Sequence, residues 1–256
     1  MSSYAVLGGT GQIGGTILKL LGKDPKNKIN VLVRSRAKLE KSYPSLSSNP
    51  NIRVFEGNIS DIENLKQCIT GTQAVLQAVA AVDNLPGCNI ALETAQALVA
   101  ALQSLRSSNS SFKPPRLVII SSSSMDHKLW SGPAFVRNLI WYANDHIYED
   151  LGRAETYLRQ HEDWLDMTFM MPGALEHDVQ LGHELSTERH HVYYISYWDC
   201  AAGMIEVADS EGQYEGKHVS IVLKPGLKTP FLWSRVPFLL LRILCYVCPW
   251  LYPWVF

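Results

Sequence analysis

Tyr4-Ala-Val-Leu-Gly8-Gly-Thr-Gly11-Gln-Ile-Gly14 is the stretch that decides the fold, an apolar run that passes directly into a series of glycines. A largely apolar segment follows at 16–21, so the pattern predicts a buried strand that turns at once into a helix. In that setting Gly8 lets the chain turn, Gly11 lets the backbone approach a pyrophosphate, and Gly14 lets the helix pack on the strand. Free N–H groups at the start of the helix then hold the phosphates. The residues predicted to bind a dinucleotide here are Gly8, Thr10, Gly11, Gln12, Ile13 and Gly14.

Composition limits the class of protein. The chain has 256 residues, of which 46% are hydrophobic, and a chain of this length and composition can bury one large core. Its 23 basic and 24 acidic residues give a net charge of −1, which provides no positive surface for nucleic acid. We therefore expect a single NAD(P)-binding domain over residues 1–256 and no nucleic-acid partner.

The N-terminus and the cysteines indicate the compartment. Met1-Ser-Ser leads straight into the first strand, without the basic region and apolar segment of a secretory signal. The five cysteines are an odd number, which argues for reduced thiols. We expect a cytoplasmic protein.

The second expected strand, at 28–33, carries the residue that selects the cofactor. Arg34 stands just past its end, 20 residues after Gly14. At this distance an acid binds the ribose 2′-hydroxyl of NAD, whereas an arginine accommodates the 2′-phosphate of NADP. No acid competes for the position, so the sequence predicts NADP(H), with Arg34 at the 2′-phosphate.

Strands and helices alternate through the first half of the chain. Further strands are expected at 51–55, 73–80 and 117–120, with amphipathic helices between them. This alternation predicts an α/β fold, a Rossmann-like doubly wound parallel sheet. Small residues toward the end of the strand at 73–80 would let a cofactor lie across its carboxyl edge, which makes Ala78 a candidate contact.

Several motifs resemble those of a known family. The glycine spacing resembles that of extended and atypical short-chain dehydrogenase/reductases, and residues 148–158 and 164–175 resemble the atypical NmrA-like branch. Within that branch, the chain is most similar to the averufin oxidase-like family of fungal aromatic polyketide pathways, with further likeness at 30–35 and 199–206. The resemblance implies an NADP-linked oxidoreductase step on an apolar aromatic substrate of the anthraquinone or xanthone type.

The same resemblance implies further cofactor contacts. Related reductases place a glycine and an acid against the adenine after the third strand, where this chain has Gly57, Asn58 and Ile59. An amide or backbone contact would then replace the acid. The resemblance also puts Ser121 at the cofactor, and Pro172 and Gly173 beside the nicotinamide.

Serine and tyrosine residues are the catalytic candidates that the resemblance implies. Short-chain reductases keep a serine for the substrate carbonyl at the end of the fifth strand, and residues 121–124 here are all serine. Tyr148 follows Ser123 by 25 residues, similar to the spacing of extended members. We expect Ser123 to hold the carbonyl and Tyr148 to protonate it while the nicotinamide delivers hydride.

One departure from the family puts ordinary carbonyl reduction in question. The lysine that lowers the tyrosine pKa four residues later is replaced by Gly152, and no lysine occurs in 129–216. A histidine can act as acid or base instead, and the candidates are His127, His146 and His177. An alternative is that His146 and Tyr148 only line an apolar helix. The missing lysine also favours a cofactor-bound isomerase, dehydratase or ring-opening enzyme, and a non-catalytic NADP sensor is a third reading.

Two later regions are expected to form a small substrate-covering part. Residues 174–197 are polar and rich in histidine, but the histidine spacing matches no metal template, so we expect no metal. Residues 226–256 gather tryptophan, tyrosine and leucine, and the 14 uncharged residues after Arg242 are too few to span a bilayer. This segment either walls an apolar pocket or contacts a membrane surface peripherally.

Overall fold

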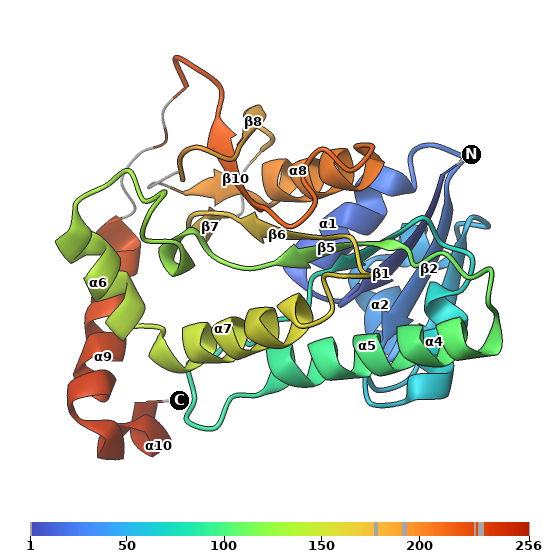
Figure 1. Ribbon diagram of the computed structural model, residues 1–256. Helices are drawn as coiled ribbons and strands as arrows, with labels where there is room; N and C mark the ends of the chain where they lie inside the picture. Colours follow the sequence, from blue (N-terminus) through green and yellow to red (C-terminus); the bar gives the residue numbers. More distant parts are fainter. Residues whose placement is uncertain (1, 177–178, 191–193, 228, 230–232, 256) are drawn as a thin grey trace.

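The protein is built around one eight-stranded sheet, seen nearly edge-on in the computed structural model (Figure 1). The structure describes residues 2–176, 179–190, 194–227, 229 and 233–255. The strand order is β3-β2-β1-β4-β5-β6-β10-β8, and only β8 runs antiparallel to its neighbour. The strands of this sheet are β1 (Ser3–Leu7), β2 (Lys28–Val33), β3 (Ile52–Glu56), β4 (Ala74–Gln77), β5 (Arg116–Ile120), β6 (Met167–Met171), β8 (His183–Ser186) and β10 (His218–Leu223).

Helices cover both faces of the sheet (Figure 1). Because successive side chains of a strand point to opposite faces, Ala5 and Leu7 pack in one core and Tyr4 and Val6 in the other. The first core contains α4 (Ile62–Ile69), α5 (Ile90–Ser108) and α7 (Asp145–Arg159). The second contains α1 (Gln12–Leu21), α2 (Arg36–Ser42), α3 (Pro44–Ser47) and α8 (Tyr197–Asp209). The predicted Rossmann-like doubly wound fold is confirmed.

The region at 174–197, expected to consist of loops, contains strands. Its β8 extends the main sheet beside β10, and β7 (Leu175–Glu176) pairs with β9 (Ile195–Ser196). Asp199, near the start of α8, accepts hydrogen bonds from the backbone of Leu181 (2.9 Å) and Gly182 (3.0 Å). This carboxylate therefore fixes the chain that leads into β8.

The C-terminal residues form a helical layer beyond the end of α7, at the left of Figure 1. Here α6 (Ala134–Tyr142) packs against α9 (Val236–Val247), and α10 (Tyr252–Val255) follows. Three short 3-10 helices, η1 (Ser123–Met125), η2 (Trp233–Arg235) and η3 (Pro249–Leu251), complete the described elements. None of the described helices is both long enough and apolar enough to cross a bilayer.

Candidate active site

Two glycines of the first turn are required by packing. Gly8 has a φ of 89°, and a Cβ there would lie 2.8 Å from the carbonyl oxygen of Ala78. A Cβ on Gly14 would lie 2.3 Å from the carbonyl oxygen of Gly8. Both positions exclude any larger residue, because backbone packs on backbone there: Gly8 on the segment that follows β4, and Gly14 on the turn after β1.

Gly11 differs from these two glycines in a way that fits a cofactor. A Cβ on Gly11 would approach only the Gly8 carbonyl oxygen, at 3.3 Å, and Gly11 is otherwise exposed. It caps the N-terminus of α1 without a side-chain hydrogen bond, and the first turn, with Gln12 exposed and Ile13 half-buried, contains no acid. The missing side chain leaves the positive end of the helix open to an anion, which fits a dinucleotide pyrophosphate.

Arg34 and its neighbour Arg36 differ in how they are held. Arg36 Nη2 donates to the carbonyl oxygen of Val54 (3.0 Å), and its backbone N–H donates to Glu56 Oε1 (3.1 Å). Arg34 is exposed, and within the described part of the chain no hydrogen bond or ion pair holds its side chain. Its guanidinium is therefore the one at the end of β2 that is available to a phosphate.

The other predicted cofactor residues follow the carboxyl ends of parallel strands. Asn58 is exposed after β3, where its Oδ1 accepts from Ser60 N (3.4 Å), and Ile59 is buried. Ala78 directly follows β4, Ser121 follows β5, and Pro172 and Gly173 follow β6. The parallel sheet thus brings all of these positions to the same edge as the glycine turn, where doubly wound folds bind their ligands.

Tyr148, in the first turn of α7, has a serine partner other than the one predicted. Ser122 Oγ donates to Tyr148 Oη over 3.3 Å, whereas we expected Ser123 to be the adjacent serine. Ser123 is only 2% exposed and begins η1, with its backbone N–H bonded to the carbonyl oxygen of Pro172 (2.9 Å). Ser122 rather than Ser123 is bonded to Tyr148 because the chain turns into η1 after Ser122, which keeps an extended conformation (φ −146°, ψ 141°).

The surroundings of Tyr148 set the state of its phenol. Burial raises the pKa of Tyr148, while hydrogen bonds with Ser122 and Ser124 and the positive charge of Arg242 lower it, and the net direction is upward. The ring of Trp141 packs against it, with centroids 5.4 Å apart. The phenol is therefore protonated at neutral pH and is suited to donating a proton.

Of the predicted histidines, the structure describes His127 and His146, and neither has a hydrogen bond to this phenol. His127 is exposed, and His146 lies beside Asp145 (Nδ1 to Oδ2, 3.8 Å) and the ring of Tyr252 (centroids 5.4 Å apart). His177 lies outside the described residues. No hydrogen bond between a histidine and Tyr148 is found in the described part of the chain.

His218 belongs to a polar cluster that the sequence analysis missed. Its Nδ1 lies 2.7 Å from Asp126 Oδ2 and its Nε2 lies 2.7 Å from Glu155 Oε1. Asp126 Oδ1 also accepts from the backbone of Leu129 (3.2 Å), so the cluster holds the loop after η1 against both α7 and β10. Asp126 next to the serines was the available signal, but its partner is 92 residues away in the chain.

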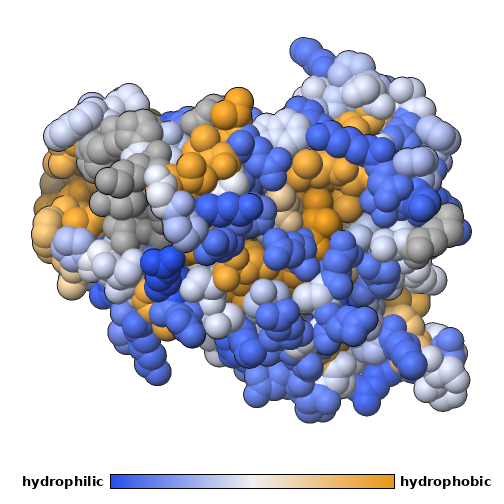
Figure 2. All heavy atoms as spheres, turned by 90° about the horizontal axis from the view of Figure 1, so that it is seen from above, coloured by the Kyte–Doolittle hydropathy of each residue, from blue (hydrophilic) through white to orange (hydrophobic). Residues whose placement is uncertain are grey.

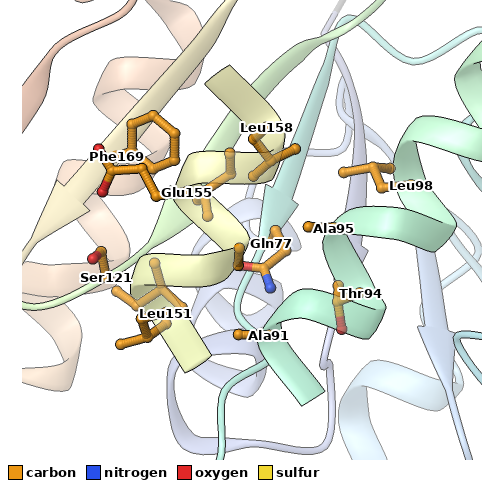
Figure 3. Close-up of a pocket in the computed structure, with 13 residues that line it drawn as sticks. Gln77, Ala91, Thr94, Ala95, Leu98, Ser121, Leu151, Glu155, Leu158 and Phe169 are labelled. Carbon is orange, nitrogen blue, oxygen red and sulfur yellow. The ribbon is translucent and has the colours of Figure 1, made fainter. Parts of the chain in front are cut away.

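A small cavity lies between α5, α7 and the central strands (Figure 3). Gln77, Ser121 and Glu155 contribute polar groups to a mostly apolar lining, which includes Leu151 and Phe169. Its volume of about 20 Å³ leaves room for roughly one water molecule. A polycyclic aromatic substrate does not fit there, so this cavity is a gap in the core.

Among the residues that the structure describes, no group of three His, Cys, Asp or Glu could hold a metal ion.

Known proteins are similar in sequence to almost the whole chain. A family model described as NAD(P)H-binding matches residues 8–211. The chain is 40% identical to Oxidoreductase stcQ of Emericella nidulans over 259 residues, covering 98% of this chain and 93% of that protein. It is 37% identical to Oxidoreductase aflX of Aspergillus parasiticus over 254 residues, covering 98% and 94%.

Solved structures show the same fold at low sequence identity. A short-chain dehydrogenase/reductase from Veillonella parvula has a TM-score of 0.70 and 17% identity, and covers 90% of this chain and 99% of its own. Another from the same organism, crystallised in complex with NADP, has the same score and identity and covers 91% and 99%.

Proposed function

We propose, from the premise that this chain belongs to the NAD(P)H-binding family and is an NAD(P)-dependent oxidoreductase, that it uses NADPH to reduce a carbonyl group of an aromatic polyketide. The resemblance to averufin oxidase-like proteins supports an anthraquinone or xanthone-type substrate. The observation that carries the proposal is the buried Tyr148 phenol, 3.3 Å from Ser122 Oγ at the carboxyl edge of β5.

Each residue has a defined part in this reaction. NADPH, when bound, supplies the hydride that adds to the carbonyl carbon. Tyr148 Oη gives its proton to the carbonyl oxygen, Ser122 supplies a hydrogen bond to the same oxygen, and the phenol is reprotonated from solvent. The carbonyl becomes an alcohol and the cofactor becomes NADP⁺.

The raised pKa of Tyr148 supports the reductive direction. A buried phenol with a raised pKa keeps its proton at neutral pH, so it is a ready acid and a poor base. The reverse oxidation would need the phenolate, which burial disfavours.

NADPH is proposed over NADH because of Arg34. Its side chain is exposed at the end of β2, where a 2′-phosphate would lie, and no acid takes the place of an arginine there. The glycine turn binds the phosphates that both cofactors share, so it supports neither cofactor over the other.

A cofactor-bound isomerase, dehydratase or ring-opening enzyme is the second candidate. The observation in its favour is Gly152, which replaces the lysine of ordinary short-chain reductases. In that case substrate would turn over without net consumption of NADPH.

Substitution of Tyr148 tests the proposed reduction. We expect Tyr148→Phe to lower kcat for NADPH oxidation by about a hundredfold or more, the usual size of one acid-base contribution, while the Kd for NADPH stays unchanged. NADPH consumption with hydroxylated anthraquinones and xanthones measures the rate. Tyr157→Phe, on the same helix beside His161, is the control and should behave as the parent. Near-parent turnover in Tyr148→Phe would remove the phenol from the mechanism.

A further inference from the structure

The C-terminal helix α9 delivers a buried arginine to the start of α7. Arg242 is 7% exposed, and its guanidinium lies over the ring of Phe238, 4.5 Å from the centroid. Nη1 donates to Asn144 Oδ1, and Nη2 donates to the carbonyl oxygen of Val82 (3.0 Å). A cation is rarely buried to this degree unless its surroundings hold it in place.

Asn144 connects this arginine to the phenol. Asn144 immediately precedes α7, and its carbonyl oxygen accepts from the backbone N–H of Tyr148 (2.9 Å). One residue thus anchors the guanidinium through its side chain and the first turn of α7 through its backbone. The guanidinium is fixed at the turn of helix that carries Tyr148.

A second anchor holds the same segment nearby. Asn84, fully buried in the loop after β4, donates to both Asp145 Oδ1 (2.8 Å) and Tyr252 Oη (3.2 Å). Its own Oδ1 accepts from the backbone of Ile147 (3.1 Å). The C-terminal segment is therefore docked at two points on the start of α7.

We infer that Arg242 is a positioning residue for Tyr148, and that it supplies from the C-terminal segment the positive charge that position 152 lacks. The inference rests on the proposed proton transfer by Tyr148. An arginine keeps its charge at any working pH, although burial lowers the pKa of Arg242 from its usual value. Its attraction to a phenolate lowers the pKa of Tyr148 and eases proton release.

Tyr148 and Arg242 each interact with a small set of neighbouring groups. Tyr148 has hydrogen bonds with Ser122 and Ser124, and Arg242 interacts with Asp83 and Tyr252 besides Tyr148. The positive charge of Arg242 acts on the phenol in the direction of a lower pKa. Removing its charge should therefore act directly on Tyr148.

Titration of the phenol at position 148 tests this inference without any substrate. The probe is 3,5-difluorotyrosine at position 148, whose more acidic phenol ionises within the pH range that the fold tolerates, followed by ¹⁹F NMR. Arg242→Gln keeps a hydrogen-bond donor but removes the charge, and should raise the pKa of the probe by about 1 unit or more. Arg242→Lys should restore the parent value. Arg235→Gln, whose arginine pairs with Glu176 at the surface, should leave it unchanged.

Two results would overturn the inference. One is an unchanged probe pKa in folded Arg242→Gln, with near-UV circular dichroism as in the parent. If Arg242→Gln does not fold, Asn144→Ala is measured instead, because it frees the guanidinium from one anchor. A probe pKa equal to that of the parent in Asn144→Ala is the second result that would overturn the inference. Absence of any carbonyl reduction would instead contradict the proposed function, because the titration needs no turnover.

An independent observation concerns the outer surface of the same segment. Figure 2 shows apolar side chains gathered at the left margin, the end of the molecule that carries α6 and α9. Six large apolar residues of α6, α9 and the short helices η2, η3 and α10 are at least 60% exposed: Phe135 (67%), Trp233 (77%), Leu240 (60%), Val247 (66%), Trp250 (70%) and Trp254 (87%). We call these six the apolar face. Exposed apolar surface of this kind marks a binding surface.

Charge indicates what covers the apolar face. The stretches 127–144 and 216–256, which contain α6 and α9, hold no aspartate or glutamate, while Arg137 on α6 is half-buried and Lys128, before α6, is exposed. Exposed tryptophans on elements that carry cations and no carboxylate of their own are typical of elements that lie at the surface of an anionic bilayer. We propose that the apolar face rests on such a surface without crossing it.

Vesicle flotation tests this proposal. Vesicles of phosphatidylcholine with phosphatidylserine should carry the parent protein upward, and Trp250→Glu/Trp254→Glu should reduce the bound fraction at least fivefold. Ser107→Glu/Ser110→Glu, at exposed positions at the end of α5, adds the same charge elsewhere and should bind as the parent. No vesicle binding by the parent contradicts the proposal. A concentration-dependent dimer that the tryptophan variant abolishes would assign the apolar face to a second copy of the chain.

Discussion

Which of the four consecutive serines is bonded to Tyr148 depends on where the chain turns after β5. A run of four serines gives no pattern by which one of them is preferred, so the spacing to Tyr148 could point only to the group. The choice comes from the start of η1, where Ser123 turns inward and its N–H bonds to Pro172. That bond joins two segments that are distant in sequence, which a local pattern does not reveal.

Paired alanine substitutions separate the two serines. Ser122→Ala should lower kcat by about a hundredfold, as loss of one donor to a developing oxyanion does. Ser123→Ala should leave kcat within about threefold of the parent, because that hydroxyl is not bonded to Tyr148. Steady-state rates of NADPH oxidation measure both. The reverse order would restore Ser123 to the role that we first expected.

Arg34 is a residue whose place was predictable from the sequence alone. Its distance from the glycines follows from the fixed geometry of a strand, a turn and a helix, and the structure leaves its side chain exposed at the end of β2. Its contact with a 2′-phosphate stays a prediction.

The Kd values of NADPH and NADH for an Arg34→Asp variant test the contact between Arg34 and the 2′-phosphate. We expect NADPH affinity to fall about 10- to 100-fold, the usual worth of a charge-assisted hydrogen bond, and NADH affinity to hold or rise. Lys38→Asp, on the exposed side of α2, serves as the control and should keep the parent preference. Equal affinities of the parent for the two cofactors would contradict the role of Arg34.

At the scale of elements, His218 ties β10, α7 and the loop after η1 together. Burial opposes its protonation, but hydrogen bonds with Glu155 and Asp126 outweigh burial and raise the pKa of His218. Burial likewise opposes ionisation of Asp126 and Glu155, yet bonding to His218 lowers the pKa of each. The protonated histidine between two carboxylates is thus favoured in the folded state.

These shifts give the cluster a definite pH dependence. The stabilisation from His218 is complete below its unfolded pKa of about 6.5 and is lost as pH rises through its higher folded value. The contribution of the carboxylates is present above their unfolded values and is lost as pH falls through the lower folded ones. The cluster should therefore stabilise the fold most near pH 5.5.

Unfolding free energies measured in urea check this behaviour. The loss of stability caused by His218→Gln should be larger at pH 5.5 than at pH 9. His161→Gln, whose histidine packs on the rings of Tyr157 and Trp164, should show no such change between the two pH values. A loss that is equal at both values would mean that His218 acts by packing alone.

The elements themselves were largely predictable up to β6, because each strand and helix there has its own apolar period and turn residues. The elements after β6 were less predictable from the sequence. β8 lies within a polar, histidine-rich stretch, and it is a strand because it pairs with β10 and because Asp199 holds its entry. Pairing of this kind depends on residues that are remote in the sequence.

At the scale of the whole molecule, the C-terminal segment joins the site to the surface. The sequence showed its apolar character and its two arginines, but not that Arg242 would be buried against Asn144, 98 residues away. The inner side of α9 meets the start of α7, and its outer side carries the apolar face.

The account depends most on net hydride transfer to a bound aromatic carbonyl. The direct measurement is the transfer of label from NADPH deuterated at the transferable C4 position to a hydroxylated anthraquinone or xanthone, followed by mass spectrometry of the product. We expect one deuterium per product molecule, one NADP⁺ formed for each, and loss of both in Tyr148→Phe. Product that forms without deuterium while NADPH stays intact would contradict it and would assign the site to isomerisation, dehydration or ring opening.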